Sequence, residues 1–123
     1  MPARALVCDD AAGYRAMLSA FLVSAGLDVE ACNSWHEAID CAAELQPDVI
    51  VVDLWMPTFD PDDLRRVHEV SAGSVIVIVS AHDAASSARY VAGIDGIAAI
   101  VSKRDHPDAI VGAVTGAVAG GVR

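Results

Sequence analysis

Short runs of aliphatic and β-branched residues alternate five times along the chain with longer stretches in which apolar residues recur at helical spacing. This alternation is typical of a parallel β-sheet whose strands are joined by crossover helices. The strands are expected at residues 5–8, 29–32, 49–53, 74–79 and 98–101. We therefore predict an α/β fold, in which a doubly wound sheet of five parallel strands lies between two layers of helices.

The stretches between the strands have recognisable helix ends. Gly26 can end a helix whose apolar positions begin at Tyr14, and Ser34 with Glu37 has the spacing of a capping box. The helices are expected at residues 14–25, 35–45, 62–70 and 84–92, and from Pro107 onward. A chain of 123 residues suits one domain. We place this domain at residues 1–119, and residues 120–123 are expected to start a linker or a C-terminal tail.

Composition excludes several classes of protein. Eight basic against 17 acidic residues give a net charge of −9, so this segment should repel nucleic acid. Cys8, Cys32 and Cys41 lack zinc-site spacing, and their odd number argues against a disulfide framework. The longest uncharged stretch near the end, residues 109–122, is shorter than the roughly 20 residues of a membrane-spanning helix. We expect a cytoplasmic domain that binds neither nucleic acid nor membrane.

Polar side chains stand where the predicted strands end. They are Asp9 and Asp10 after the first strand, Asp53 at the end of the third, Ser80 after the fourth and Lys103 after the fifth. Open parallel sheets bind ligands beyond the carboxyl ends of their strands. We therefore expect these five side chains to meet at one edge of the sheet.

Three carboxylates at one place repel one another unless a cation neutralises them. Mg²⁺ is the expected cation because it prefers oxygen ligands and takes one or two carboxylates together with phosphate oxygens. A remaining carboxylate can then attack a phosphoryl group and form an aspartyl phosphate. Asp53 is the expected nucleophile because it ends the central strand, whereas Asp9 and Asp10 are better placed to hold the metal.

Four short motifs give the chain a family resemblance. They are Leu6-Val-Cys-Asp-Asp10, Val51-Val-Asp-Leu-Trp-Met-Pro57, Val79-Ser-Ala81 and Val101-Ser-Lys103. In this combination and order the chain resembles the receiver domain of two-component response regulators over nearly its whole length. Residues 96–120 are similar to the receivers that precede a helix-turn-helix output domain of the LuxR type.

The resemblance implies a flavodoxin-like three-layer sandwich with strand order 2-1-3-4-5. It implies phosphorylation of Asp53 by a sensor histidine kinase, with Ser80 and Ala81 as the switch positions and Lys103 bonded to the phosphoryl group. Mg²⁺ would be held by Asp9, Asp10, Asp53 and the backbone carbonyl of Trp55. The output would be transcription, through a LuxR-type DNA-binding domain outside this segment, with a homodimer as a possible active form.

The chain departs from the family pattern at three places. Asp60-Pro61 stands where a glycine is usual, so the loop after Pro57 is expected to take a different path. Ile100 replaces the usual aromatic switch residue, and Arg104 replaces a proline that often follows the lysine. A cis bond before a residue other than proline costs roughly 3 kcal/mol, so a trans bond is expected after Lys103.

Other residues lead to secondary predictions. Trp55 and His82 follow Asp53 and Ser80 by two residues, and we predict that they shield the acyl phosphate from water. In the last helix a stripe of glycines, Gly112, Gly116 and Gly120, should face away from the core. The remaining histidines, His36, His68 and His106, are expected to be surface or capping residues.

Two other functions are compatible with these residues. A Mg²⁺-dependent phosphatase with an aspartyl-phosphate intermediate would use similar ligands. Such enzymes normally have Asp-x-Asp on one strand, however, and Trp55 stands two residues after Asp53. The other is a receiver-like module that binds a partner without phosphorylation. Pro61 and Ile100 leave this alternative open, but the intact set of Asp9, Asp10, Asp53, Ser80 and Lys103 argues against it.

Overall fold

A computed structural model describes residues 2–57 and 60–121 of the chain. Its parallel sheet has five strands in the order β2-β1-β3-β4-β5, which confirms the predicted fold and strand order. The strands are β1 (Arg4–Cys8), β2 (Asp28–Cys32), β3 (Val49–Asp53), β4 (Val75–Ser80) and β5 (Ile97–Ser102). The helices are α1 (Ala12–Ser24), α2 (Trp35–Leu45), α3 (Pro61–Val70), α4 (Ala84–Val91) and α5 (Pro107–Gly121).

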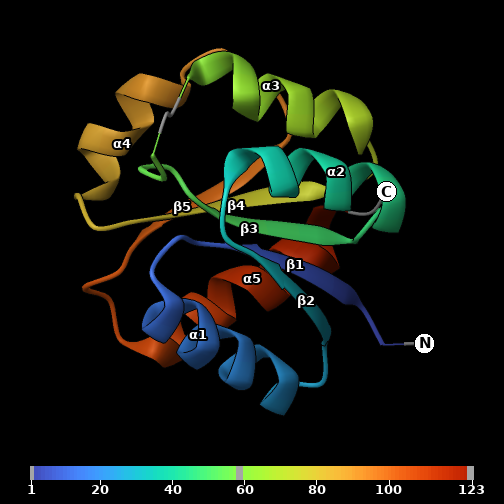
Figure 1. Ribbon diagram of the computed structural model, residues 1–123. Helices are drawn as coiled ribbons and strands as arrows, with labels where there is room; N and C mark the ends of the chain where they lie inside the picture. Colours follow the sequence, from blue (N-terminus) through green and yellow to red (C-terminus); the bar gives the residue numbers. More distant parts are fainter. Residues whose placement is uncertain (1, 58–59, 122–123) are drawn as a thin grey trace.

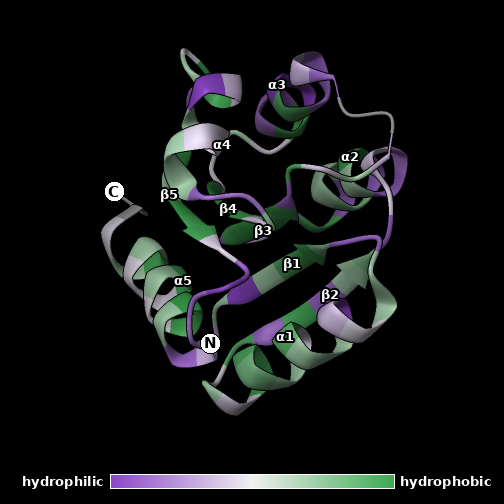
Figure 2. Cartoon of the chain, turned by 90° about the vertical axis from the view of Figure 1, so that its left-hand side faces the viewer, coloured by the Kyte–Doolittle hydropathy of each residue, from purple (hydrophilic) through white to green (hydrophobic). Residues whose placement is uncertain are grey.

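The helices form two layers around the sheet. Figure 1 shows α1 and α5 on one face of the sheet and α2, α3 and α4 on the other. The strands between these layers are largely hydrophobic, as Figure 2 shows. β3 lies at the centre with all five of its residues buried, because parallel strands in such a sheet are covered on both faces.

Side chains alternate between the two faces along each strand, as the pleat of a β-strand requires. Even-numbered residues of the central strands face α2, α3 and α4: Leu6, Cys8, Ile50, Val52, Ile76 and Ile78. Odd-numbered residues face α1 and α5: Ala5, Val7, Val49, Val51, Val77 and Val79. Asp9 and Asp53 continue the odd-numbered series of β1 and β3. The pleat therefore places both carboxylates on the side of α1 and α5.

Three helices, α2, α3 and α4, begin at serine or aspartate side-chain caps. The Ser34 hydroxyl accepts from the Glu37 N–H at 3.2 Å, as predicted. Asp60 accepts from the Asp62 N–H at 2.9 Å and Pro61 occupies the first turn, so α3 begins one residue before the predicted start. Asp83 accepts from the Ser86 N–H at 2.7 Å. These caps satisfy N–H groups that have no partner within their own helix.

The glycine face of α5 points outward, as predicted. Ile110 and Val114 are buried, whereas Gly112, Gly116 and Gly120 are exposed and line a groove of about 440 Å³. α5 continues through Gly121, so the domain boundary that we place after residue 119 lies inside its last turn, and residues 122–123 lie outside the described residues. The boundary itself and a homodimer stay predictions.

The departures from the family pattern have different outcomes. The described residues contain no cis peptide bond, so the bond after Lys103 is trans, as predicted. The path of the loop after Pro57 runs through residues 58–59, which lie outside the described residues. Across the two described ranges, no helix is both long enough and apolar enough to span a membrane.

Candidate functional site

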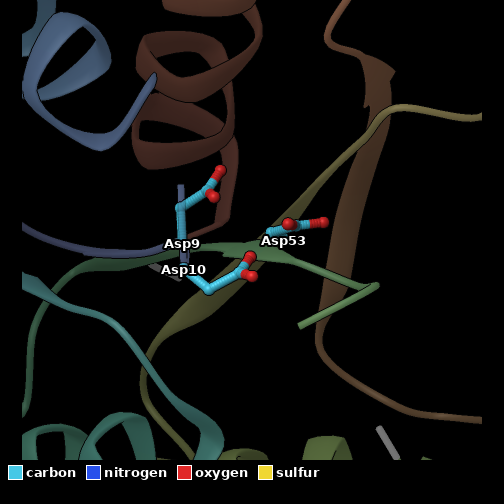
Figure 3. A group of neighbouring side chains, drawn as sticks. All are labelled: Asp9, Asp10 and Asp53. Carbon is cyan, nitrogen blue, oxygen red and sulfur yellow. The ribbon is translucent and has the colours of Figure 1, made fainter. Parts of the chain in front are cut away.

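Three carboxylates meet at the carboxyl ends of β1 and β3. Asp9, Asp10 and Asp53 each present an oxygen within 4.8 Å of the other two, and Figure 3 shows the three side chains gathered around one space. Asp9 and Asp53 are 3% and 6% exposed, whereas Asp10 is open to solvent. The sequence therefore predicted this cluster correctly, and its exposed member leaves a route in from solvent.

Lys103 supplies the positive charge of the site. Its Nζ lies 2.7 Å from Asp9 Oδ2 and 3.4 Å from Asp53 Oδ2. Burial lowers the pKa of this ammonium, but the hydrogen bond that it donates to Asp9 and the charges of Asp53 and Asp9 outweigh burial and raise the pKa above its ordinary value. Lys103 is therefore a permanent cation at neutral pH.

The backbone also fixes Lys103 to the neighbouring strand. Its N–H donates to the carbonyl oxygen of Ser80 at 2.7 Å. The two residues predicted to respond to a phosphoryl group are therefore tied to each other through the main chain.

Asp53 is the less engaged of the two buried carboxylates. Asp9 accepts the Ala11 N–H at 2.9 Å on one oxygen and Lys103 at 2.7 Å on the other. Asp53 accepts the Trp55 N–H at 3.0 Å on Oδ1, while Lys103 is 3.4 Å from Oδ2. Burial raises the pKa of Asp53, although the Trp55 N–H and Lys103 oppose that rise. Asp53 is thus a comparatively basic carboxylate with one weakly bonded oxygen.

The predicted switch hydroxyl lies on the adjacent strand. Ser80 ends β4 and is fully buried, and its Oγ accepts the backbone N–H of His82 at 3.1 Å. That bond uses an oxygen lone pair and leaves the hydroxyl hydrogen to donate elsewhere. Ala81 follows as an exposed residue, and Ile100 of β5 is partly buried against the core on the side of α2, α3 and α4.

Aromatic rings meet around Trp55, in the loop that follows Asp53. The Trp55 ring meets the His82 ring at a centroid distance of 4.9 Å and the Tyr90 ring at 4.7 Å, both edge to face. Trp55 is half-buried, and His82 and Tyr90 are exposed. The sequence singled out Trp55 and His82 but not Tyr90. Tyr90 lies on α4, and the direction of its side chain depends on the rotation of that helix about its axis, which the sequence alone does not give.

Tyr14 is the second aromatic residue that sequence reasoning left without a role. Its ring lies under Lys103, with Nζ 4.4 Å from the ring centroid. It is on the first turn of α1, just after the loop that holds Asp9 and Asp10. Its closeness in sequence to Asp9 and Asp10 could have indicated a role at the site. The pattern of apolar residues, however, predicted that Tyr14 is a core residue.

The donor set fits a hard divalent cation. All three clustered ligand groups are carboxylates, and one of them is exposed, as Mg²⁺ requires when it keeps several water molecules. Receiver domains generally bind Mg²⁺ in an acidic pocket of this kind. Asp9, Asp10 and Asp53 are the groups that would hold the ion, and the carbonyl of Trp55 stays a predicted ligand.

Comparison with known proteins agrees with this geometry. The family model of the response regulator receiver domain matches residues 5–115. The chain is 34% identical over 96 residues to the response regulator MprA of Mycolicibacterium vanbaalenii, a match that covers 77% of this chain and 41% of the relative. It is also 34% identical over 84 residues to the chemotaxis protein CheY of Thermotoga maritima, covering 66% of this chain and 69% of the relative.

Solved structures share the fold. A CheY-like receiver domain protein from Methanospirillum hungatei JF-1 has a TM-score of 0.87 at 16% identity, covering 97% of this chain and 95% of that chain. A LuxR-family two-component response regulator from Aurantimonas sp. SI85-9A1 has a TM-score of 0.81 at 25% identity, covering 98% and 87%. The sequence match over residues 5–115, the strand order and the acidic cluster agree, and the chain belongs to the receiver-domain family of two-component response regulators.

Proposed function

We propose that this domain is a phosphorylation switch in which Asp53 is the phospho-acceptor. The observation that carries the proposal is the meeting of three carboxylates within 4.8 Å, with the ammonium of Lys103 bound to two of them. A phosphoryl group is the ligand that such a site is suited to accept, because its oxygens need both a divalent cation and a fixed positive charge.

The transfer we propose is a displacement at phosphorus. The weakly bonded Oδ2 of Asp53 attacks the phosphorus of a phosphohistidine on a sensor histidine kinase. The new O–P bond forms as the P–N bond breaks, and the leaving imidazole nitrogen keeps the electron pair. Bound Mg²⁺ would neutralise charge on the phosphoryl oxygens. Lys103 pairs with one of these oxygens, and Ser80 donates its hydroxyl hydrogen to another.

The switch itself follows from these new bonds. Ser80 moves toward the phosphoryl group to donate to it, and the Lys103 N–H is bonded to the Ser80 carbonyl at 2.7 Å. Ala81 and the start of α4 follow Ser80 along the chain, so α4 shifts toward a second packing available only with phosphate present. Ile100 is partly buried and stands where the family usually has an aromatic switch residue. Its side chain is smaller than an aromatic ring.

We also propose that Trp55 and His82 slow the loss of phosphate. Their rings are in contact, and the two residues follow Asp53 and Ser80 by two positions each, which supports a role in screening the acyl phosphate from water. Replacing Trp55 with asparagine should shorten the lifetime of the phosphorylated form. An unchanged lifetime would remove this role and leave Trp55 as a packing residue of the loop.

The output we propose is control of transcription by a DNA-binding domain outside this segment. The chain spans 41% of the length of MprA relatives, and another relative is named the DNA-binding response regulator MtrA. LuxR-family regulators are among the proteins that share the fold. These similarities support a regulator of gene expression.

The decisive experiment measures the intact mass of the protein after incubation with acetyl phosphate and Mg²⁺, beside an Asp53→Ala variant. A gain of about 80 Da that is absent from the variant is expected. If neither acetyl phosphate nor a phosphorylated histidine kinase gives that gain, while Mg²⁺ still binds, the proposal fails and a module that works without phosphorylation is favoured.

A further inference from the structure

The ammonium of Lys103 has an aromatic neighbour besides its two carboxylates. Nζ lies 4.4 Å from the centroid of the Tyr14 ring, well inside the range of a cation–π interaction. Oxygens of Asp9 and Asp53 lie 2.7 and 3.4 Å from the same nitrogen. Lys103 is therefore held by groups from three different parts of the chain.

The ring matters because the ammonium is largely removed from water. The side chain of Lys103 is only 18% exposed, and cation–π attraction is strongest where the cation is desolvated. A lysine has a flexible four-carbon stem, so its position depends on what surrounds the ammonium. Asp9 is the nearer carboxylate and would draw the ammonium away from Asp53 if nothing else held it.

Tyr14 is suited to act through its ring and not through its hydroxyl. Burial, followed by the charges of Asp9 and Asp53, raises the pKa of its phenol to about 12, so the phenol is neutral over the physiological range. Its hydroxyl is buried without a hydrogen-bond partner among the described residues. The ring itself is packed against the core on the side of α1 and α5, which fixes its face under Lys103.

We propose that Tyr14 is the positioning residue of Lys103, and that its ring face holds the ammonium between Asp9 and Asp53 where it can meet a phosphoryl group on Asp53. The geometric part of this inference stands on the contacts above. Its effect on phosphorylation rests on the proposed function.

The test varies the ring electronically while keeping its shape. Phenylalanine and its mono-, di- and trifluorinated analogues are incorporated at position 14, since fluorination weakens the negative ring face without changing the fold. Tyr14→Leu removes the ring altogether. Phe21→Leu is the matched control, because it removes a 39% exposed aromatic ring from the same helix, about two turns beyond Tyr14.

Two readouts separate this inference from the proposed function. The first is the NMR shift of the Lys103 ε-methylene protons, which the ring current displaces upfield whether or not the protein is phosphorylated. The second is the rate of phosphorylation by acetyl phosphate. We expect Tyr14→Phe to keep the shift and a rate within about twofold, and Tyr14→Leu to lose the shift and slow the rate roughly 2- to 30-fold.

The fluorinated series should lower the rate stepwise from phenylalanine toward the leucine value, and Phe21→Leu should change neither readout. Equal rates across the fluorinated series would overturn the inference. So would a Tyr14→Phe variant as slow as Tyr14→Leu, since the hydroxyl would then be the active group. A parent protein that takes up no phosphate defeats the proposed function alone, because the methylene shift still reports on the ring contact.

Discussion

The rings of Trp55 and Tyr90 meet edge to face, with centroids 4.7 Å apart and planes at 80°. Trp55 belongs to the loop after β3, two residues from Asp53, and Tyr90 belongs to α4. An aromatic pair of this geometry contributes about 0.5–1.5 kcal/mol beyond the area it buries. The loop that follows the acceptor and the helix expected to move are thus attached to each other directly.

Tyr90→Ala should therefore shorten the lifetime of the phosphorylated form. Without Tyr90 the indole of Trp55 loses a ring contact that attaches it to α4, and under the proposed role it should screen the acyl phosphate less of the time. We expect phosphate to be lost roughly two- to tenfold faster, measured as decay of the phosphorylated mass after excess acetyl phosphate is removed. Tyr90→Phe keeps the edge contact and is the control, and decay at the parent rate in Tyr90→Ala would contradict the coupling.

Asp53→Asn should stabilise the fold at neutral pH in the absence of divalent cations. Burial raises the pKa of Asp53 in the folded protein, so the protonated carboxyl contributes to folding stability below its ordinary pKa of 3.8. This contribution to stability is lost as the pH rises through the raised pKa of the folded state. The ionised carboxylate then costs stability that the neutral amide does not. Lys103 keeps its closer partner Asp9 at 2.7 Å.

Thermal unfolding in EDTA, followed from pH 3 to pH 8, measures this effect. The melting temperature of Asp53→Asn should exceed that of the parent at pH 7 by a few degrees, and the two should converge at the acidic end. Asp28→Asn, which changes an exposed carboxylate, should show no such convergence. An Asp53→Asn variant less stable than the parent at pH 7 would show that the bond to Lys103 outweighs burial.

Gly116→Ala should stabilise the protein. A Cβ at this position meets no atom within 4 Å, and the glycine lies inside α5. Alanine is favoured over glycine in a helix interior by roughly 1 kcal/mol, which corresponds to about 3–5 °C in melting temperature. Calorimetry measures the shift. Sedimentation of Gly116→Leu separately tests whether the predicted homodimer forms through the groove lined by Gly112, Gly116 and Gly120, because a dimer formed there should dissociate.

Gly96→Ala gives the opposite expectation and serves as the contrasting variant. Gly96 has φ +87, and a Cβ there would lie 2.5 Å from the Nδ1 atom of His68. Both the backbone and the ring must shift, so we expect a loss of more than about 1 kcal/mol. A Gly96→Ala protein as stable as the parent would mean that the His68 ring can turn away freely.

Ser87→Ala should also stabilise the fold, through α4. The Ser87 side chain is fully buried, and its hydroxyl has no hydrogen-bond partner among the described residues. Removing a buried hydroxyl that lacks a partner should recover about 1 kcal/mol, measured by urea unfolding. The neighbouring Ser86→Ala is the control, because its exposed hydroxyl donates to Asp83 and its loss should give no gain.

The carboxyl ends of the strands were predictable because two local rules determine them. Continuous apolar runs such as residues 49–53 locate the strands, and the direction of a parallel sheet brings their ends together. Asp9, Asp10, Asp53, Ser80 and Lys103 were found in this way. Strand and helix ends lay within two residues of the prediction. α1 begins two residues early, at Ala12, without a side-chain cap, and α3 begins one residue early because Asp60 caps it.

The contacts made by helices could not be predicted in the same way. Tyr14 and Tyr90 reach the site through the rotation of α1 and α4 about their axes, which depends on packing against the sheet and not on spacing alone. His68 was expected at the surface, but its Nδ1 is buried because its ring packs on the bare backbone of Gly96. His106 is a capping residue, as predicted, accepting from the Asp108 N–H.

The alternation of side chains along β1 and β3 makes the site sensitive to chain length. Asp9 and Asp53 face α1 and α5 only because each is an even number of residues from Val7 and Val51. A one-residue insertion between Val51 and Asp53 would turn the acceptor toward the opposite layer, against α2 and α3. A two-residue insertion would restore its direction but displace it by about 6.6 Å along the strand. The domain can thus accept changed residues in these strands far more readily than changed lengths.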